Sequence, residues 1–93
     1  MEFINNNDKQ LKFADIRGVI SELNDDGEFC SITLICGHEK LRDVNLATRR
    51  VEFEKIISKH KIGDKVMCRY YPSSKKKHSR WYTHLILLSI QID

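Results

Sequence analysis

Residues 28–36 read Glu-Phe-Cys-Ser-Ile-Thr-Leu-Ile-Cys and give the clearest structural signal in the chain. Side chains of a β-strand point alternately to opposite faces of the sheet. Here one face collects Cys30, Ile32, Leu34 and Cys36, while the other face mixes polar and apolar residues. This alternation is typical of a strand with one buried face and one wetter face.

The segment before this strand carries a turn and a second strand. Asn-Asp-Asp-Gly at 24–27 predicts a tight hairpin turn, because Asp-Gly supplies the positive φ that such turns need. Residues 11–23 read as a long strand with Gly18 near its middle. A glycine inside a strand often marks a bulge or a bend at a barrel corner. The ten residues before it, 1–10, are polar and are expected to form a flexible tail, or at most an extra edge strand that uses Phe3 and Ile4.

The segment after residues 28–36 adds a third strand and a helix. Residues 40–46 read as a strand, although without clean alternation. Thr48 is expected to be the N-cap of a helix over 49–60, since its hydroxyl is able to accept a hydrogen bond from a first-turn amide. An apolar stripe at helical spacing supports this helix and consists of Phe53, Ile56 and Ile57.

Two further strands complete the order. Gly63 ends the helix and leads into a strand over 65–71, followed by a polar loop over 72–79 and a last strand over 80–92. The order β-β-β-α-β-β predicts an all-β fold with one short helix, a closed five-stranded β-barrel of the OB type. Residues 11–93 are expected to form one such domain.

The composition fits one soluble domain. The chain has 93 residues, of which 41% are hydrophobic and 31% charged. Its longest apolar run, Leu85 to Leu88, is far shorter than the roughly 20 residues of a membrane-spanning helix. The polar start lacks a signal-peptide pattern, so a cytoplasmic location is expected, with no membrane partner.

The three cysteines favour reduced thiols. An odd number argues against a closed disulfide framework, and each cysteine sits in an apolar run where a thiol behaves as a small hydrophobe. A zinc site would need His38 together with Cys30, Cys36 and Cys68, but these residues lack the close ligand pairs that structural zinc sites use. No metal and no cofactor are expected.

Positive charge is concentrated in the last third of the chain. The formal net charge is +3. Residues 1–64 contain ten Lys or Arg and twelve Asp or Glu, whereas residues 65–93 contain six Lys or Arg and one acid, Asp93. The second part therefore carries a net charge of +5 against −2 in the first. A local positive field of this kind attracts polyanions.

The second half also resembles a known family. Lys-Ile-Gly-Asp-Lys-Val at 61–66 opens a strand, and Arg-Trp-Tyr-Thr at 80–83 follows a basic hairpin loop. This arrangement resembles bacterial single-stranded DNA-binding proteins and a related small family of OB-fold domains of unknown function. The resemblance implies an OB barrel that binds single-stranded DNA. The sequence departs from the DNA-binding family at 40–47, which has none of that family's stacking aromatics.

Cations and aromatic residues alternate between Arg69 and Tyr82, with no acid among them. Proteins bind single strands with cations that follow the phosphates and aromatic rings that stack on bases. The sequence therefore predicts non-catalytic binding of single-stranded nucleic acid; the family resemblance favours DNA as the ligand, while the residues themselves leave DNA and RNA open. The predicted binding residues are Arg69, Tyr71, Lys75, Lys76, Lys77, Arg80, Trp81 and, from the strand over 28–36, Phe29.

Other interpretations of these residues remain open. The three consecutive lysines also suit a solvated hairpin tip, and Trp81 also suits a structural or interface role. Counting by twos from an exposed Ser89 places Tyr82 and His84 on the inner face of the last strand. No catalytic constellation appears at a spacing that supports chemistry, so no enzyme activity is expected.

The last strand also suggests association. Leu85 to Leu88 is apolar on both faces, whereas a strand of a monomeric barrel should be wet on one. The same counting places Leu85 and Leu87 on the outer face, where they are predicted to form the interface of a homodimer or a higher symmetric oligomer. The alternative function is therefore a protein-interaction or assembly module built on an OB barrel.

Overall fold

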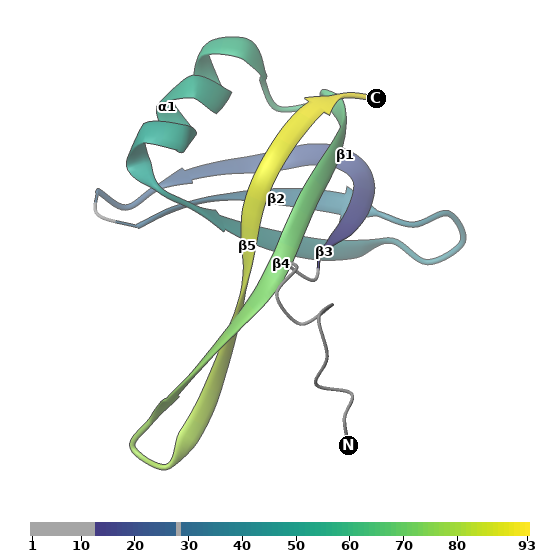
Figure 1. The fold of residues 1–93 in the computed structure, drawn as a ribbon. Coiled ribbons are helices and arrows are strands. Elements are labelled where there is room, and N and C mark those ends of the chain that lie inside the picture. Colours follow the sequence, from purple (N-terminus) through teal and green to yellow (C-terminus); the bar gives the residue numbers. More distant parts are fainter. Residues whose placement is uncertain (1–12, 28) are drawn as a thin grey trace, which may run out of the picture.

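The computed structural model describes residues 13–27 and 29–93. The predicted tail over 1–10 lies outside these residues. Five strands and one helix follow one another in the predicted order (Figure 1). They are β1 (Ala14–Asp25), β2 (Cys30–Cys36), β3 (Arg42–Thr48), α1 (Arg50–Lys59), β4 (Lys65–Lys77) and β5 (Arg80–Ile92).

The five strands close into a barrel in the order β1-β2-β3-β5-β4. Neighbouring strands are antiparallel except for β3 and β5, which run parallel and meet at Ala47 and Ile86. The helix α1 lies between β3 and β4 in the chain and packs over one end of the barrel (Figure 1). This architecture confirms the predicted five-stranded OB barrel.

β1 belongs to both halves of the barrel. Its first part, Ala14 to Val19, pairs with β4, and its second part, from Val19 to Asp25, pairs with β2. Gly18 lies just before this change of partner. A Cβ atom at that position would lie 2.7 Å from both the Sγ of Cys36 and the backbone oxygen of Ile35. The strand therefore needs a glycine there to pass so close to β2.

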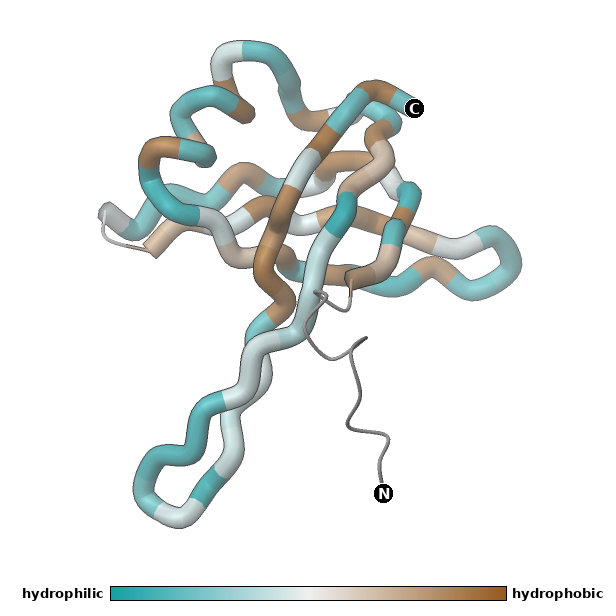
Figure 2. The backbone as a smooth tube through the Cα atoms, viewed as in Figure 1, coloured by the Kyte–Doolittle hydropathy of each residue, from teal (hydrophilic) through white to brown (hydrophobic). Residues whose placement is uncertain are grey.

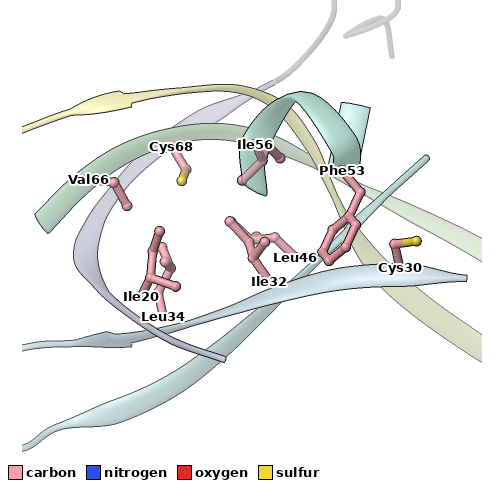
Figure 3. Close-up of a cluster of buried hydrophobic side chains, with 9 residues drawn as sticks. All are labelled: Ile20, Cys30, Ile32, Leu34, Leu46, Phe53, Ile56, Val66 and Cys68. Carbon is pink, nitrogen blue, oxygen red and sulfur yellow. The ribbon is translucent and has the colours of Figure 1, made fainter. Parts of the chain in front are cut away.

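Nine side chains form the core (Figure 3). The strands supply most of them through the alternation that the sequence shows, and α1 supplies Phe53 and Ile56. Ile57, the third residue of the predicted stripe, is 46% exposed and lies outside the core. The core consists of Ile20, Cys30, Ile32, Leu34, Leu46, Phe53, Ile56, Val66 and Cys68.

The predicted cap of the helix is wrong. Thr48 is the last residue of β3, and the N-cap position belongs to Arg49, which makes no side-chain capping hydrogen bond. The Thr48 hydroxyl is buried without a hydrogen-bond partner among the described residues. The strand thus continues two residues beyond its predicted end, which delays the start of the helix to Arg50.

The predicted loop over 72–79 is mostly strand. β4 continues to Lys77 and pairs with β5 up to Arg80, and only His78 and Ser79 form the turn. Both turn residues have positive φ, 52° and 66°, as expected for a two-residue hairpin turn. Pro72 is tolerated because β4 has left its β1 neighbour by that point and is an edge strand.

This part of the hairpin extends away from the barrel (Figure 1). The pairing of β4 with β1 ends at Tyr70, and the contact of β5 with β3 lies at Ile86. We call residues 72–85 the ribbon, since among the described residues β4 and β5 have only each other as strand neighbours there. Figure 2 shows a hydrophilic tip and an apolar stretch of β5 where the strand joins the barrel.

A β-bulge in β5 reverses the predicted faces of that strand. Arg69 pairs with Ser89 but Tyr70 pairs with Leu87, so Leu88 has no partner across the ladder. The prediction that Leu85 and Leu87 face outward is therefore wrong, because both pack against the core. Leu88 instead is 41% exposed.

The helix of the described chain is too short and too polar to span a membrane.

Candidate nucleic-acid interface

A groove of about 400 Å³ lies where the ribbon joins the barrel. Its walls come from three places that are distant in the sequence: the residue before β2, the junction of β3 with α1, and the outer face of β4 and β5. The lining residues are Phe29, Ala47, Thr48, Arg49, Tyr71, Ser73, Lys75, His84 and Ile86.

The groove continues along one face of the ribbon. A second hollow, of about 500 Å³, is lined by Lys75, Lys77, His78, Tyr82 and His84. Lys75 and His84 line both hollows, so the two form one surface. In the ladder Lys75 lies opposite Tyr82 and Lys77 lies opposite Arg80, which places these four side chains on the same face. We call this surface the groove face.

The groove face is positive and carries exposed aromatic rings. Phe29 is 73% exposed and Tyr82 is 46% exposed. None of the residues that line the two hollows is a carboxylate. Within residues 13–27 and 29–93, no ion pair involves Arg49, Lys75 or Lys77. These cations are available to an anionic ligand.

The loop that carries Phe29 is held by the helix. Arg50, in the first turn of α1, forms an ion pair with Asp25, and its guanidinium donates to the Gly27 carbonyl oxygen at 3.0 and 2.7 Å. The hydrogen bond from Arg50 lowers the pKa of Asp25, and the Gly27 amide adds to this. Phe29 closes the same turn with its backbone oxygen 2.9 Å from the Asp26 nitrogen.

Arg69 does not join the groove face, contrary to the sequence prediction. Its Nε donates to Asp15 Oδ1 at 2.9 Å, and its guanidinium lies 4.5 Å from the centre of the Phe13 ring. This hydrogen bond lowers the pKa of Asp15. Arg69 is thus engaged on the β1 side of the barrel, where a carboxylate already neutralises it.

Trp81 and Lys76 lie on the opposite side of the ribbon from the groove face. They pair with each other in the ladder, one residue out of phase with Lys75 and Tyr82. A hydrogen bond of 2.8 Å between the hydroxyls of Ser74 and Thr83 marks the same side. The prediction that Trp81 shares a surface with Tyr71 is wrong. Its physical reason is the Leu88 bulge, which shifts β5 by one residue.

The structure brings Phe29, Tyr71, Lys75, Lys77 and Arg80 of the predicted set to one face. Sequence reasoning missed the other residues of that face because the same bulge moves Tyr82 and His84 outward. The sequence prediction places Arg49 in the helix and Ser73 in a loop. Knowledge that Leu88 is unpaired in the β4–β5 ladder would have placed Tyr82 and His84 on the correct face. The missed residues are Ala47, Thr48, Arg49, Ser73, His78, Tyr82, His84 and Ile86.

The sequence matches no protein-family model and no curated protein. Its backbone, however, resembles solved structures. The mitochondrial single-stranded DNA-binding protein Rim1 from S. cerevisiae superimposes with a TM-score of 0.67 at 9% identity, over 88% of this chain and 95% of that one. A second crystal form gives 0.64 at 11% identity, over 88% and 94%.

A small single-stranded DNA-binding protein from Streptomyces coelicolor superimposes with a TM-score of 0.51 at 10% identity, over 89% of this chain and 94% of that one. At identities this low, the superpositions establish a shared fold and nothing further. Together with the closed barrel and its strand order, they show that the chain is an OB-fold domain whose backbone resembles those of single-stranded DNA-binding proteins.

Proposed function

We propose that this protein binds single-stranded nucleic acid along the groove face, without catalysing a reaction. The observation that carries the proposal is the meeting of Phe29 and Tyr71 with Arg49 and Lys75 in one groove free of carboxylates. Aromatic rings that line a groove provide stacking surfaces for bases, at roughly 1–3 kcal/mol per stacked base, and the cations follow the phosphates.

The arrangement of these residues suits a nucleic-acid strand that runs from the barrel onto the ribbon. A base in the groove has Phe29 and Tyr71 as neighbours, and the next part of the strand meets Tyr82 between Lys75 and Lys77. Every base has a π-face, so this recognition is tolerant of sequence. The solved structures with similar backbones named above are described as single-stranded DNA-binding proteins, which favours DNA over RNA as the ligand.

The test is a titration of a dye-labelled single strand at several salt concentrations. Binding through phosphates releases counterions, so the logarithm of the association constant should fall with a slope of roughly −0.7 per phosphate contacted. Substitution Tyr71→Ala should weaken binding by about tenfold for one lost stacking surface. Ile62→Ala, at a 60% exposed residue away from the groove, is the matched control. Absence of binding at low salt would refute the proposal.

A second candidate function is a protein-interaction or assembly module. The observation that favours it is a hollow between α1 and β5, where Leu87, Leu88, Ile90 and Ile56 form an apolar part beside charged and polar residues, mostly of the helix. The expected homo-oligomer would use Leu88, which is exposed, rather than Leu85 or Leu87. A Leu88→Glu variant with a lower mass than the wild type in light scattering would support this function. Equal masses would argue against it.

A further inference from the structure

The side of the ribbon opposite the groove face carries its own aromatic and cationic pair. We call this side the second face and define it by Ser74, Lys76, Trp81 and Thr83, which form two neighbouring pairs on that side of the ladder, Ser74 with Thr83 and Lys76 with Trp81. Trp81 is 68% exposed, and no barrel strand adjoins the ribbon in the described chain. The second face is therefore open to a ligand along the ribbon.

Its chemistry repeats that of the groove face. Directly opposed residues of an antiparallel pair have Cβ atoms about 4.5–5.5 Å apart, so the Lys76 ammonium and the Trp81 ring serve one small surface. A flat ring next to a cation matches a base next to its phosphate. The next pair adds hydroxyls, Ser74 and Thr83, and no acid occurs between residues 65 and 92.

A segment of single-stranded nucleic acid cannot contact both faces at the same point, because the β4–β5 ribbon lies between them. We infer that the second face is a second site for single-stranded nucleic acid, so that one protomer holds two segments at once. This inference rests on the proposed function of the groove face. The second segment is either a separate strand or another stretch of the same strand that passes around the ribbon.

Neighbouring lysines give a matched pair of variants for the test. Lys75→Glu and Lys76→Glu make the same charge change at exposed, adjacent residues, but on opposite faces. Trp81 is the only tryptophan of the chain, so its fluorescence reports the second face alone. A dye on an oligonucleotide of about eight nucleotides, within the site size of one OB fold, reports total binding by anisotropy.

Wild-type protein should bind two such oligonucleotides per chain and show quenched Trp81 emission. Lys76→Glu should abolish the quenching and leave one oligonucleotide per chain, whereas Lys75→Glu should retain the quenching. One oligonucleotide per wild-type chain, weakened equally by both substitutions, would overturn the inference. If the wild-type protein causes no change in the anisotropy of the labelled oligonucleotide at low salt, the proposed function itself is refuted. Binding that Lys76→Glu abolishes and that Lys75→Glu and Tyr71→Ala leave intact would place the only site on the second face.

Two arms distinguish the sources of the second segment. A mixture of short oligonucleotides carrying donor or acceptor dyes shows energy transfer if separate strands meet on one protomer. A longer oligonucleotide with a dye at each end shows its ends approaching if one strand passes around the ribbon. Lys76→Glu should abolish whichever transfer occurs, while Lys75→Glu serves as the charge control. Transfer in neither arm would contradict two simultaneous segments.

Discussion

Arg50 and Asp25 connect the first turn of the helix to the end of β1 through an ion pair. The same guanidinium holds the Gly27 carbonyl oxygen at 3.0 and 2.7 Å, so the β1–β2 turn is fixed against α1. Phe29 follows this turn and forms one wall of the groove. The position of an exposed ring, which packing in the core does not determine, thus depends on one arginine.

Removing this arginine should weaken binding more than folding. Both partners of the ion pair are more than 40% exposed, so solvent screens their attraction and Arg50→Ala should lower the free energy of unfolding only slightly. Release of Phe29 should lower the affinity for a single-stranded oligonucleotide by about tenfold, the value of one stacked base. Denaturant melts and anisotropy titrations measure the two effects.

Glu54→Ala is the control for Arg50→Ala. It removes the other ion pair of Arg50, at 3.5 Å, and leaves the contacts with Asp25 and Gly27 in place. Its affinity should equal that of the wild type. An Arg50→Ala variant with unchanged affinity would show that the clamp does not position Phe29.

The bulge in β5 predicts a sharp contrast between two adjacent leucines. Leu87→Ala should destabilise the protein by about 2 kcal/mol, since Leu87 packs against the core. Leu88→Ala should cost less than about 1 kcal/mol, because Leu88 has no partner in the ladder and is 41% exposed. Urea denaturation of both variants is the measurement. A larger cost at Leu88 than at Leu87 would contradict the observed register.

The same residues show how much of the fold could be predicted. Strict alternation in β2 and the Asp-Gly turn before it are local signals, and they gave the correct hairpin and barrel order. The Leu88 bulge is not local. Its position depends on how β5 lies against both Arg69 and Tyr70 of β4, so counting by twos from Ser89 assigned the wrong face to every residue before it.

The site was less predictable than the fold for a related reason. Composition points to the basic, aromatic segment between Arg69 and Tyr82, but the face on which each side chain lies depends on register. Pro72 and its serine neighbours suggested a loop, yet the strand continues because β4 is an edge strand there. Arg69 looked available in the sequence, since its partner Asp15 lies 54 residues away.

The close approach at Gly18 predicts intolerance of even one methyl group. In Gly18→Ala the added Cβ would meet the backbone oxygen of Ile35 at 2.7 Å, and backbone atoms cannot move aside cheaply. We expect a loss of about 1–3 kcal/mol in the free energy of unfolding. Gly27→Asn is the comparison, at a position with φ of +83° where an added Cβ would meet no described atom beyond its chain neighbours within 4 Å, and should change stability by less than about 1 kcal/mol. Equal losses in both variants would refute the packing explanation.

The buried thiol of Cys68 predicts a loss of stability in alkali. Burial raises the pKa of Cys68 from 9.0 to about 12. Above pH 9 the unfolded chain releases this proton and the folded chain retains it, so stability falls as the pH rises from 9 towards 12. The slope from this group is about −1.4 kcal/mol per pH unit.

Cys68→Val isolates this contribution from that of other groups that titrate in alkali. Urea melts between pH 8 and about 11 should show a shallower decline in the variant than in the wild type. Identical slopes in the two proteins would mean that the Cys68 thiol is not protected from ionisation.

The most direct test of the groove face is to follow backbone amide chemical shifts while an unlabelled single-stranded oligonucleotide is added. Binding as proposed predicts the largest shifts at Phe29, at Ala47 to Arg49 and along the ribbon from Tyr71 to Ile86. Shifts concentrated on the outer side of α1 and at residues 61–64, with the groove unchanged, would contradict the account.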